Sequence, residues 1–72
     1  MTLTISHRVN IDGFAHEPTL HAIRLPDGWP VPALTDRIDV HSVEGVPVRG
    51  RVIGRTFTDA GVMLMVEEAR VR

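Results

Sequence analysis

The sequence predicts one all-β domain over residues 1–72, folded as a small antiparallel barrel or rolled sheet. Residues 2–11 alternate between apolar and polar side chains, which is the period of a half-buried strand. Short segments of similar character follow, separated by acid–glycine and proline turns. A hydrophobic fraction of 43% is typical of globular chains, and 72 residues leave room for a single core.

The first predicted strand, residues 2–11, has an apolar face and a polar face. Its apolar face holds Leu3, Ile5, Val9 and Ile11. His7 interrupts that row, which suits a buried and hydrogen-bonded ring. Asp12-Gly13 then makes either a two-residue hairpin turn or the start of a wider loop that runs through Pro18.

Residues 19–25 are predicted to form the second strand, although Leu20 is out of phase with Ile23 and Leu25. Residues 26–35 form a connecting loop, because prolines and an Asp-Gly step weaken any sheet ladder. The third strand covers residues 36–42, with Ile38 and Val40 directed inward.

Residues 46–57 form the fourth predicted strand. Val46, Val48 and Val52 share one face with Gly50 and Gly54, which permit a sharp bend or the close approach of another backbone. The opposite face holds Arg49, Arg51 and Arg55. Ile53 and Phe57 are out of phase with the valines, which indicates a bulge near Gly54.

Residues 62–71 fit both a strand and a helix, and the tight connection at residues 59–61 favours the strand. Met63 and Met65 are then exposed unless another chain covers them. A total of five short strands matches an SH3-like barrel best.

Composition and spacing argue against an enzyme, a metal site and a bound cofactor. The four histidines, at positions 7, 16, 21 and 41, have no metal-ligand spacing. Ser6 and His7 are adjacent, but neighbouring strand side chains diverge; His21 and His41 are expected to face solvent. No glycine-rich phosphate loop is present, and the sequence contains no cysteine.

The arginine row is the first candidate site. Arg49, Arg51 and Arg55 on one strand face are able to meet phosphates of a nucleic acid, and Arg70 or Arg72 could join them. The favoured alternative is a solvated face, neutralised across strands by acidic residues at positions 39, 44, 67 and 68.

The second candidate site is apolar and would bind protein. Trp29 is a possible interface anchor, although the only tryptophan of a small domain more often covers one end of the core. Met63 and Met65 are the other candidates, because apolar side chains on both faces of a strand indicate burial on both sides.

Part of the chain resembles small uncharacterised β-proteins of actinobacterial phages. The residues concerned are the segment 9–17 (Val-Asn-Ile-Asp-Gly-Phe-Ala-His-Glu), Leu25-Pro26 and Asp36-Arg37-Ile38, with Thr35 where those chains usually have glycine. The resemblance implies a phage or prophage setting and no activity.

These observations predict a non-enzymatic protein-binding or assembly module, which associates with itself or docks onto a larger partner. The alternative is a nucleic-acid-binding module that uses the arginine row. A net charge of −1 gives no general attraction to nucleic acid or membranes. No signal peptide or apolar span is evident, so the expected location is the host cytoplasm or a virus particle.

Overall fold

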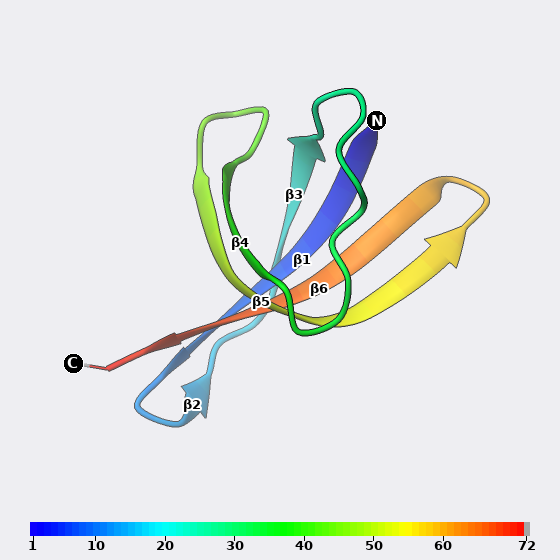
Figure 1. Ribbon diagram of the computed structural model, residues 1–72. Helices are drawn as coiled ribbons and strands as arrows, with labels where there is room; N and C mark the ends of the chain where they lie inside the picture. Colours follow the sequence, from blue (N-terminus) through cyan, green and yellow to red (C-terminus); the bar gives the residue numbers. More distant parts are fainter. Residues whose placement is uncertain (72) are drawn as a thin grey trace.

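The computed structural model describes residues 1–71 and confirms an all-β domain (Figure 1). Its elements are β1 (Thr2–Ile11), β2 (Phe14–Ala15), β3 (Thr19–Arg24), β4 (Arg37–His41), β5 (Pro47–Thr58) and β6 (Gly61–Arg70). The ambiguous C-terminal segment is therefore a strand. The described residues include no helix of the length and apolarity needed to cross a membrane.

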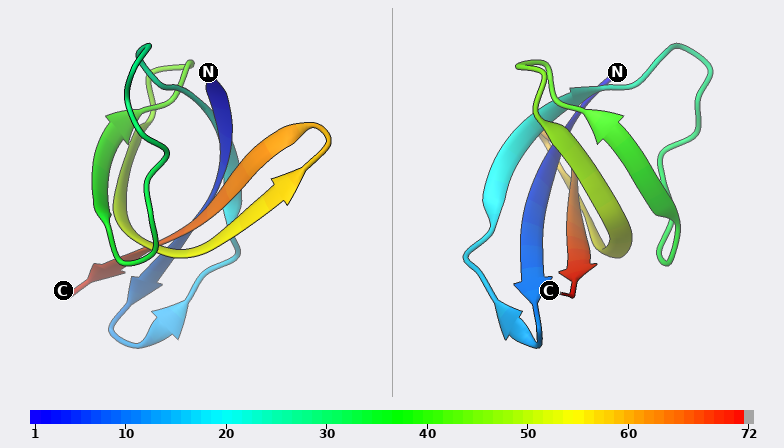
Figure 2. Two further views of the ribbon diagram at one scale, coloured as in Figure 1. Left: turned by 45° about the vertical axis from the view of Figure 1, so that its right-hand side comes forward. Right: turned by 90° about the vertical axis from the view of Figure 1, so that its left-hand side faces the viewer.

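The sheet is mixed and open, so the prediction of a five-stranded antiparallel barrel of the SH3-like type is wrong in its details. Six strands follow the order β2-β1-β6-β5-β4, with β3 paired to β1 beside β2. β1 pairs antiparallel with β2 and β3 on one edge and runs parallel to β6 on the other. Among the described residues, a single backbone hydrogen bond bridges the two facing edges, from the Val43 N–H to the Ala22 carbonyl at 2.9 Å. Figure 2 shows the sheet rolled but unclosed.

The Asp12-Gly13 step makes the two-residue turn of a short hairpin. Ile11 pairs with Phe14, and both turn residues have positive φ, 51° at Asp12 and 86° at Gly13. Positive φ at both central residues defines the type I′ turn, whose twist suits adjacent strands. The two-residue turn is therefore the alternative that the structure shows, and residues 16–18 connect β2 to β3.

The core lies on the inner face of the rolled sheet, where the predicted alternation places it. Its buried apolar side chains are Leu3, Ile5, Ile23, Leu25, Val48, Val52, Leu64 and Val66. Ile38 and Val40 pack against this cluster, as predicted. Val46 does not join it, because β5 begins at Pro47 and Val46 stays 40% exposed in the preceding turn.

The loop of residues 25–36 crosses the open side of the roll (Figures 1 and 2). Val31 packs against the core, and backbone bonds tie Thr35 and Asp36 to Val52. Thr35 has a φ of +73°, a left-handed conformation that is costly for a β-branched residue. Glycine adopts that conformation freely.

β5 is irregular at Gly50 and between Val52 and Gly54, the two places where the sequence predicted it. A Cβ on Gly50 would lie 2.4 Å from the Glu67 carbonyl oxygen, so glycine permits the close backbone approach that was predicted there. The predicted bulge is confirmed: the register with β6 shifts between Val52 and Gly54. Ile53 is therefore the extra residue, and the side chains that follow it change faces.

Candidate functional site

The outer face of the central sheet carries a patch without charge. Two cross-strand rows make it, each running from β3 through β1 and β6 to β5. One row is Ala22, Thr4, Met63 and Thr56, and the other is Leu20, Ser6, Met65 and Gly54. We call these eight residues the neutral patch. Solvent-facing sheet surfaces usually carry charged side chains, so a patch of this composition is unusual.

Two long apolar side chains stand out within the neutral patch. Leu20 is 66% exposed and Met65 is 42% exposed, while Met63 is half-buried. Both methionines therefore lie on the face opposite the core, as predicted. Ile53, 46% exposed in the bulge beside Gly54, extends the apolar surface.

Trp29 does not cover the core, so the favoured interpretation of this side chain is wrong. It is 63% exposed, in a turn held by a bond from its own N–H to the Pro26 carbonyl. Val31, two residues later, supplies the apolar contact with the core instead. The Trp29 loop lies on the inner side of the roll and the methionines on the outer side, so these candidates form two surfaces.

The arginine row is broken by the bulge. Arg51 faces Glu67 and Arg37 in the register, whereas Arg55 pairs with Leu64 and so lies on the other face. Arg55 stacks on Phe57, with its guanidinium carbon 5.2 Å from the ring centre. Arg70 pairs with Glu68, and Arg72 lies outside the described residues.

The carboxylates that were predicted to neutralise the arginine row do not reach every arginine. Asp39 lies 4.0 Å from Arg49, while Glu67 pairs with Arg8 rather than with Arg51. Within residues 1–71, neither Arg37 nor Arg51 has a carboxylate at salt-bridge distance. These two arginines lie directly opposite each other across β4 and β5, a like-charge pairing that an anion would relieve.

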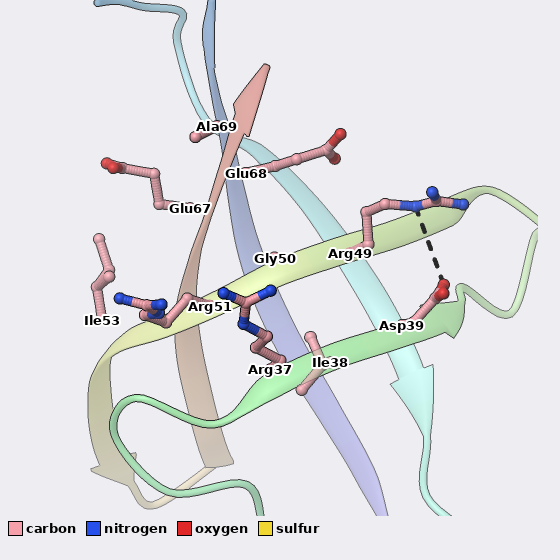
Figure 3. Close-up of a pocket in the computed structure, with 10 residues that line it drawn as sticks. All are labelled: Arg37, Ile38, Asp39, Arg49, Gly50, Arg51, Ile53, Glu67, Glu68 and Ala69. Atoms are coloured by element: carbon pink, nitrogen blue, oxygen red, sulfur yellow. Dashed lines mark ion pairs between the residues drawn. The ribbon is translucent and has the colours of Figure 1, made fainter. Parts of the chain in front are cut away.

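A groove of about 850 Å³ runs along these arginines (Figure 3). Figure 3 shows Arg49 turned toward Asp39, with Arg37 and Arg51 extending from neighbouring strands. Glu67, Glu68 and Asp39 also line the groove, so three arginines face three carboxylates. The groove is polar but carries no net formal charge.

His7 is buried and hydrogen-bonded, as its position on the apolar row suggested. Its side chain is 8% exposed, and Nε2 lies 3.1 Å from both the Arg49 carbonyl oxygen and Glu68 Oε1. Both neighbours are acceptors, so Nε2 carries the hydrogen. Because His7, Arg49 and Glu68 belong to β1, β5 and β6, this contact joins three strands.

Glu68 anchors that contact. The Nε of Arg70 donates to Glu68 Oε2 at 2.5 Å, and this hydrogen bond is the main cause that lowers the pKa of the Glu68 carboxyl. The charge of Arg70 and the bond with His7 lower the pKa further, while partial burial opposes them. Glu68 therefore stays ionised and holds the His7 ring in place at neutral pH.

The structure places Ser6 and the histidines that the sequence singled out on different faces of the sheet. Ser6 lies on the outer face and His7 on the inner face, as predicted, so they do not meet. His21 was expected to face solvent, but it lies half-buried on the inner face with its ring 6.0 Å from that of His7. His41 is exposed, as expected. Within residues 1–71, no three metal-ligating side chains gather.

Two features of the site were missed from the sequence. Leu20 belongs to the neutral patch, and its being out of phase with Ile23 was the available signal. Arg37 joins Arg51, a pairing that only the register of β4 against β5 reveals.

No family model matches the sequence, and no curated protein or solved structure matches the chain.

Proposed function

We propose that the chain is a non-enzymatic protein-binding or assembly module, and that the neutral patch is its contact surface. The patch supports this proposal because its residues span four strands without a charge and include the exposed side chains of Leu20 and Met65. Exposed apolar side chains rimmed by polar ones are typical of protein interaction sites. The charged pair Arg8–Glu67 borders the patch and would form part of such a rim.

A domain of this size gains from a partner. A single small core contributes only about 3–5 kcal/mol of net stability, and the absence of cysteine excludes stabilisation by a disulfide. Binding of a partner to the folded state adds stability by mass action. The proposed setting, a phage particle or the cytoplasm of its host, rests on the sequence resemblance alone.

Photo-cross-linking tests this proposal. A photoreactive amino acid replaces Met65, and Leu34, which is 55% exposed in the connecting loop, serves as the matched control. In cells that naturally make the chain, position 65 should give a discrete protein adduct, either with a second copy or with a larger protein. The added substitution Leu20→Lys should remove that adduct. Equal, diffuse labelling from positions 65 and 34 would contradict the proposal.

A second candidate function is binding of nucleic acid along the arginine groove. The opposed arginines Arg37 and Arg51 favour it, and Arg55 no longer contributes because it lies on the other face. The balance of charge in the groove places it second. If it binds, affinity for a single-stranded oligonucleotide falls steeply with salt and is lost in Arg37→Ala/Arg51→Ala, but is retained in Arg55→Ala. Equal binding by all three proteins would exclude this site.

A further inference from the structure

The second half of β5 is an open strand edge. β4 pairs with residues 47–51, and Thr35 and Asp36 continue that edge as far as Val52. Among residues 1–71, no strand pairs with the same edge of residues 53–58. Figures 1 and 2 show this part of β5 extending with β6 as a hairpin away from the rest of the sheet. An unpaired edge is a template for another strand.

The register identifies which backbone groups are free. The two-residue turn closes on the pair Thr58 and Gly61, so the backbone groups of Thr58, Thr56 and Gly54 point toward β6. Those of Arg55 and Phe57 point to the open edge. Counting from the N-terminal side gives the same result. The N–H and carbonyl of Val52 point away from β6, toward Thr35 and Asp36, and the extra residue of the bulge shifts the alternation by one, so Arg55 is the next residue with free groups.

The edge has little of the charge, and none of the proline, that commonly protect a strand edge from pairing. Residues 53–58 contain no proline and one charge, Arg55, which stacks on Phe57 instead of projecting freely. Phe57 is 65% exposed. The segment is therefore weakly charged and rich in residues that favour strands.

We propose that residues 54–58 of two copies of this chain pair antiparallel across a two-fold axis at Thr56. This inference rests on the proposed function and names a second copy as the partner. Arg55 of each copy then lies opposite Phe57 of the other, which uses all four free backbone groups of each edge. Each Arg55 also lies beside the other copy's Phe57 ring, so the cation–π contact is repeated between copies.

This register pairs the whole free edge and brings the outer faces of the two copies together. Gly54 meets Thr58 of the second copy, so pairing ends where the turn begins on one side and where Asp36 covers Val52 on the other. Thr56 belongs to the neutral patch, and two Thr56 side chains would meet at the axis. The patches of both copies then join into one surface, which is left free for a larger partner.

Single-cysteine variants test the pairing, because the natural chain contains no cysteine. At the axis, two Thr56→Cys residues occupy a non-hydrogen-bonded pair with Cα atoms about 4.5 Å apart, which a disulfide spans. Thr58→Cys is the matched control on the same strand and face, and its two copies lie roughly 13 Å apart. Under mild oxidation, Thr56→Cys should form a covalent dimer at least about tenfold faster than Thr58→Cys. Equal rates would overturn the proposal.

Sedimentation of the natural chain separates this inference from the proposed function. We expect a monomer–dimer equilibrium that Phe57→Pro weakens at least about tenfold, because proline removes one edge N–H from each copy. Phe57→Ala keeps that N–H and controls for the ring. A chain that stays monomeric, or a dimer lost in Met65→Lys but kept in Phe57→Pro, would overturn edge pairing. The proposed function would still stand in either case if position 65 cross-links to protein.

Discussion

The two halves of β5 belong to one continuous strand but have different surroundings. Residues 47–51 pair with β4, Arg51 and Val52 also pair with β6, and Val48 and Val52 are buried in the core. Residues 53–58 pair on one edge only, and apart from half-buried Gly54 they are exposed. The first half therefore holds the fold together, whereas the second half, with the neutral patch beside it, is available for binding.

Ile53 marks the change between the halves. As the extra residue of the bulge, it moves Arg55 and Phe57 to the inner face and Gly54 and Thr56 to the outer face. The charged outer row that begins with Arg49 and Arg51 thus gives way to small, neutral residues.

The largest difference between the halves should appear at their glycines. In Gly50→Ala, the new methyl group meets the Glu67 backbone and the φ of +148° disfavours any side chain, so we expect a loss of about 3 kcal/mol. In Gly54→Ala the new methyl group meets the flexible end of Met65, and the loss should stay under about 1 kcal/mol. Urea unfolding measures the loss of stability in each variant. Equal losses at Gly50 and Gly54 would contradict the difference between the two halves of β5.

The next effect concerns the Glu68 contact with His7, which fixes the first half of β5 through the Arg49 carbonyl. Because folding lowers the pKa of Glu68 below its ordinary value of 4.5, its contribution is present above that value. It is lost as the pH falls through the lower pKa of the folded state. Glu68→Gln should cost roughly 1–2 kcal/mol at neutral pH and flatten the acid side of the stability profile.

Urea unfolding at a series of pH values checks this prediction. Glu67→Gln is the matched control, because Glu67 pairs with the more exposed Arg8 on the outer face. If Glu68→Gln and Glu67→Gln change the stability at acid pH alike, the Glu68 contact with His7 does not cause the loss of stability at low pH.

Thr35 bounds the first half, since its N–H binds the Val52 carbonyl. Thr35→Gly should relieve the left-handed strain and raise the free energy of unfolding by up to about 1 kcal/mol. Thr19→Gly, at the start of β3, is the control and should lower it. The midpoint of thermal unfolding at low concentration decides between these outcomes, and a loss at Thr35 would show that the turn is unstrained.

The smallest effects on folding are expected in the second half and on the patch. Phe57→Ala and Met65→Lys should each change monomer stability by no more than about 0.5 kcal/mol, because Phe57 is 65% exposed and Met65 lies on the face opposite the core. Measured at low concentration, a loss above 2 kcal/mol from either substitution would show that the side chain serves the fold.

The sequence predicted the single-chain features well. The alternation in residues 2–11, the turn at Asp12-Gly13 and the bulge near Gly54 can all be read from residues that are neighbours in the chain. The strand order cannot, so the parallel pairing of β1 with β6 and the open edge were missed.

The candidate site shows the same division. A bulge was predicted, yet Arg55 was still assigned to the face of Arg49, although a shift of one residue moves every later side chain to the other face. Met63 and Met65 were correctly placed outside the core. Their neighbours Leu20 and Ala22 come from another strand, so only the register brings them together.

Hydrogen exchange of individual β5 amides, followed as the protein concentration is raised, tests most directly whether the second half is an open binding edge. We predict that the Arg55 and Phe57 amides exchange fast in dilute solution and slow progressively with concentration, while the Thr56 and Thr58 amides stay protected throughout. Protection of Arg55 and Phe57 that is high at every concentration, or fast exchange that concentration never slows, would contradict the account.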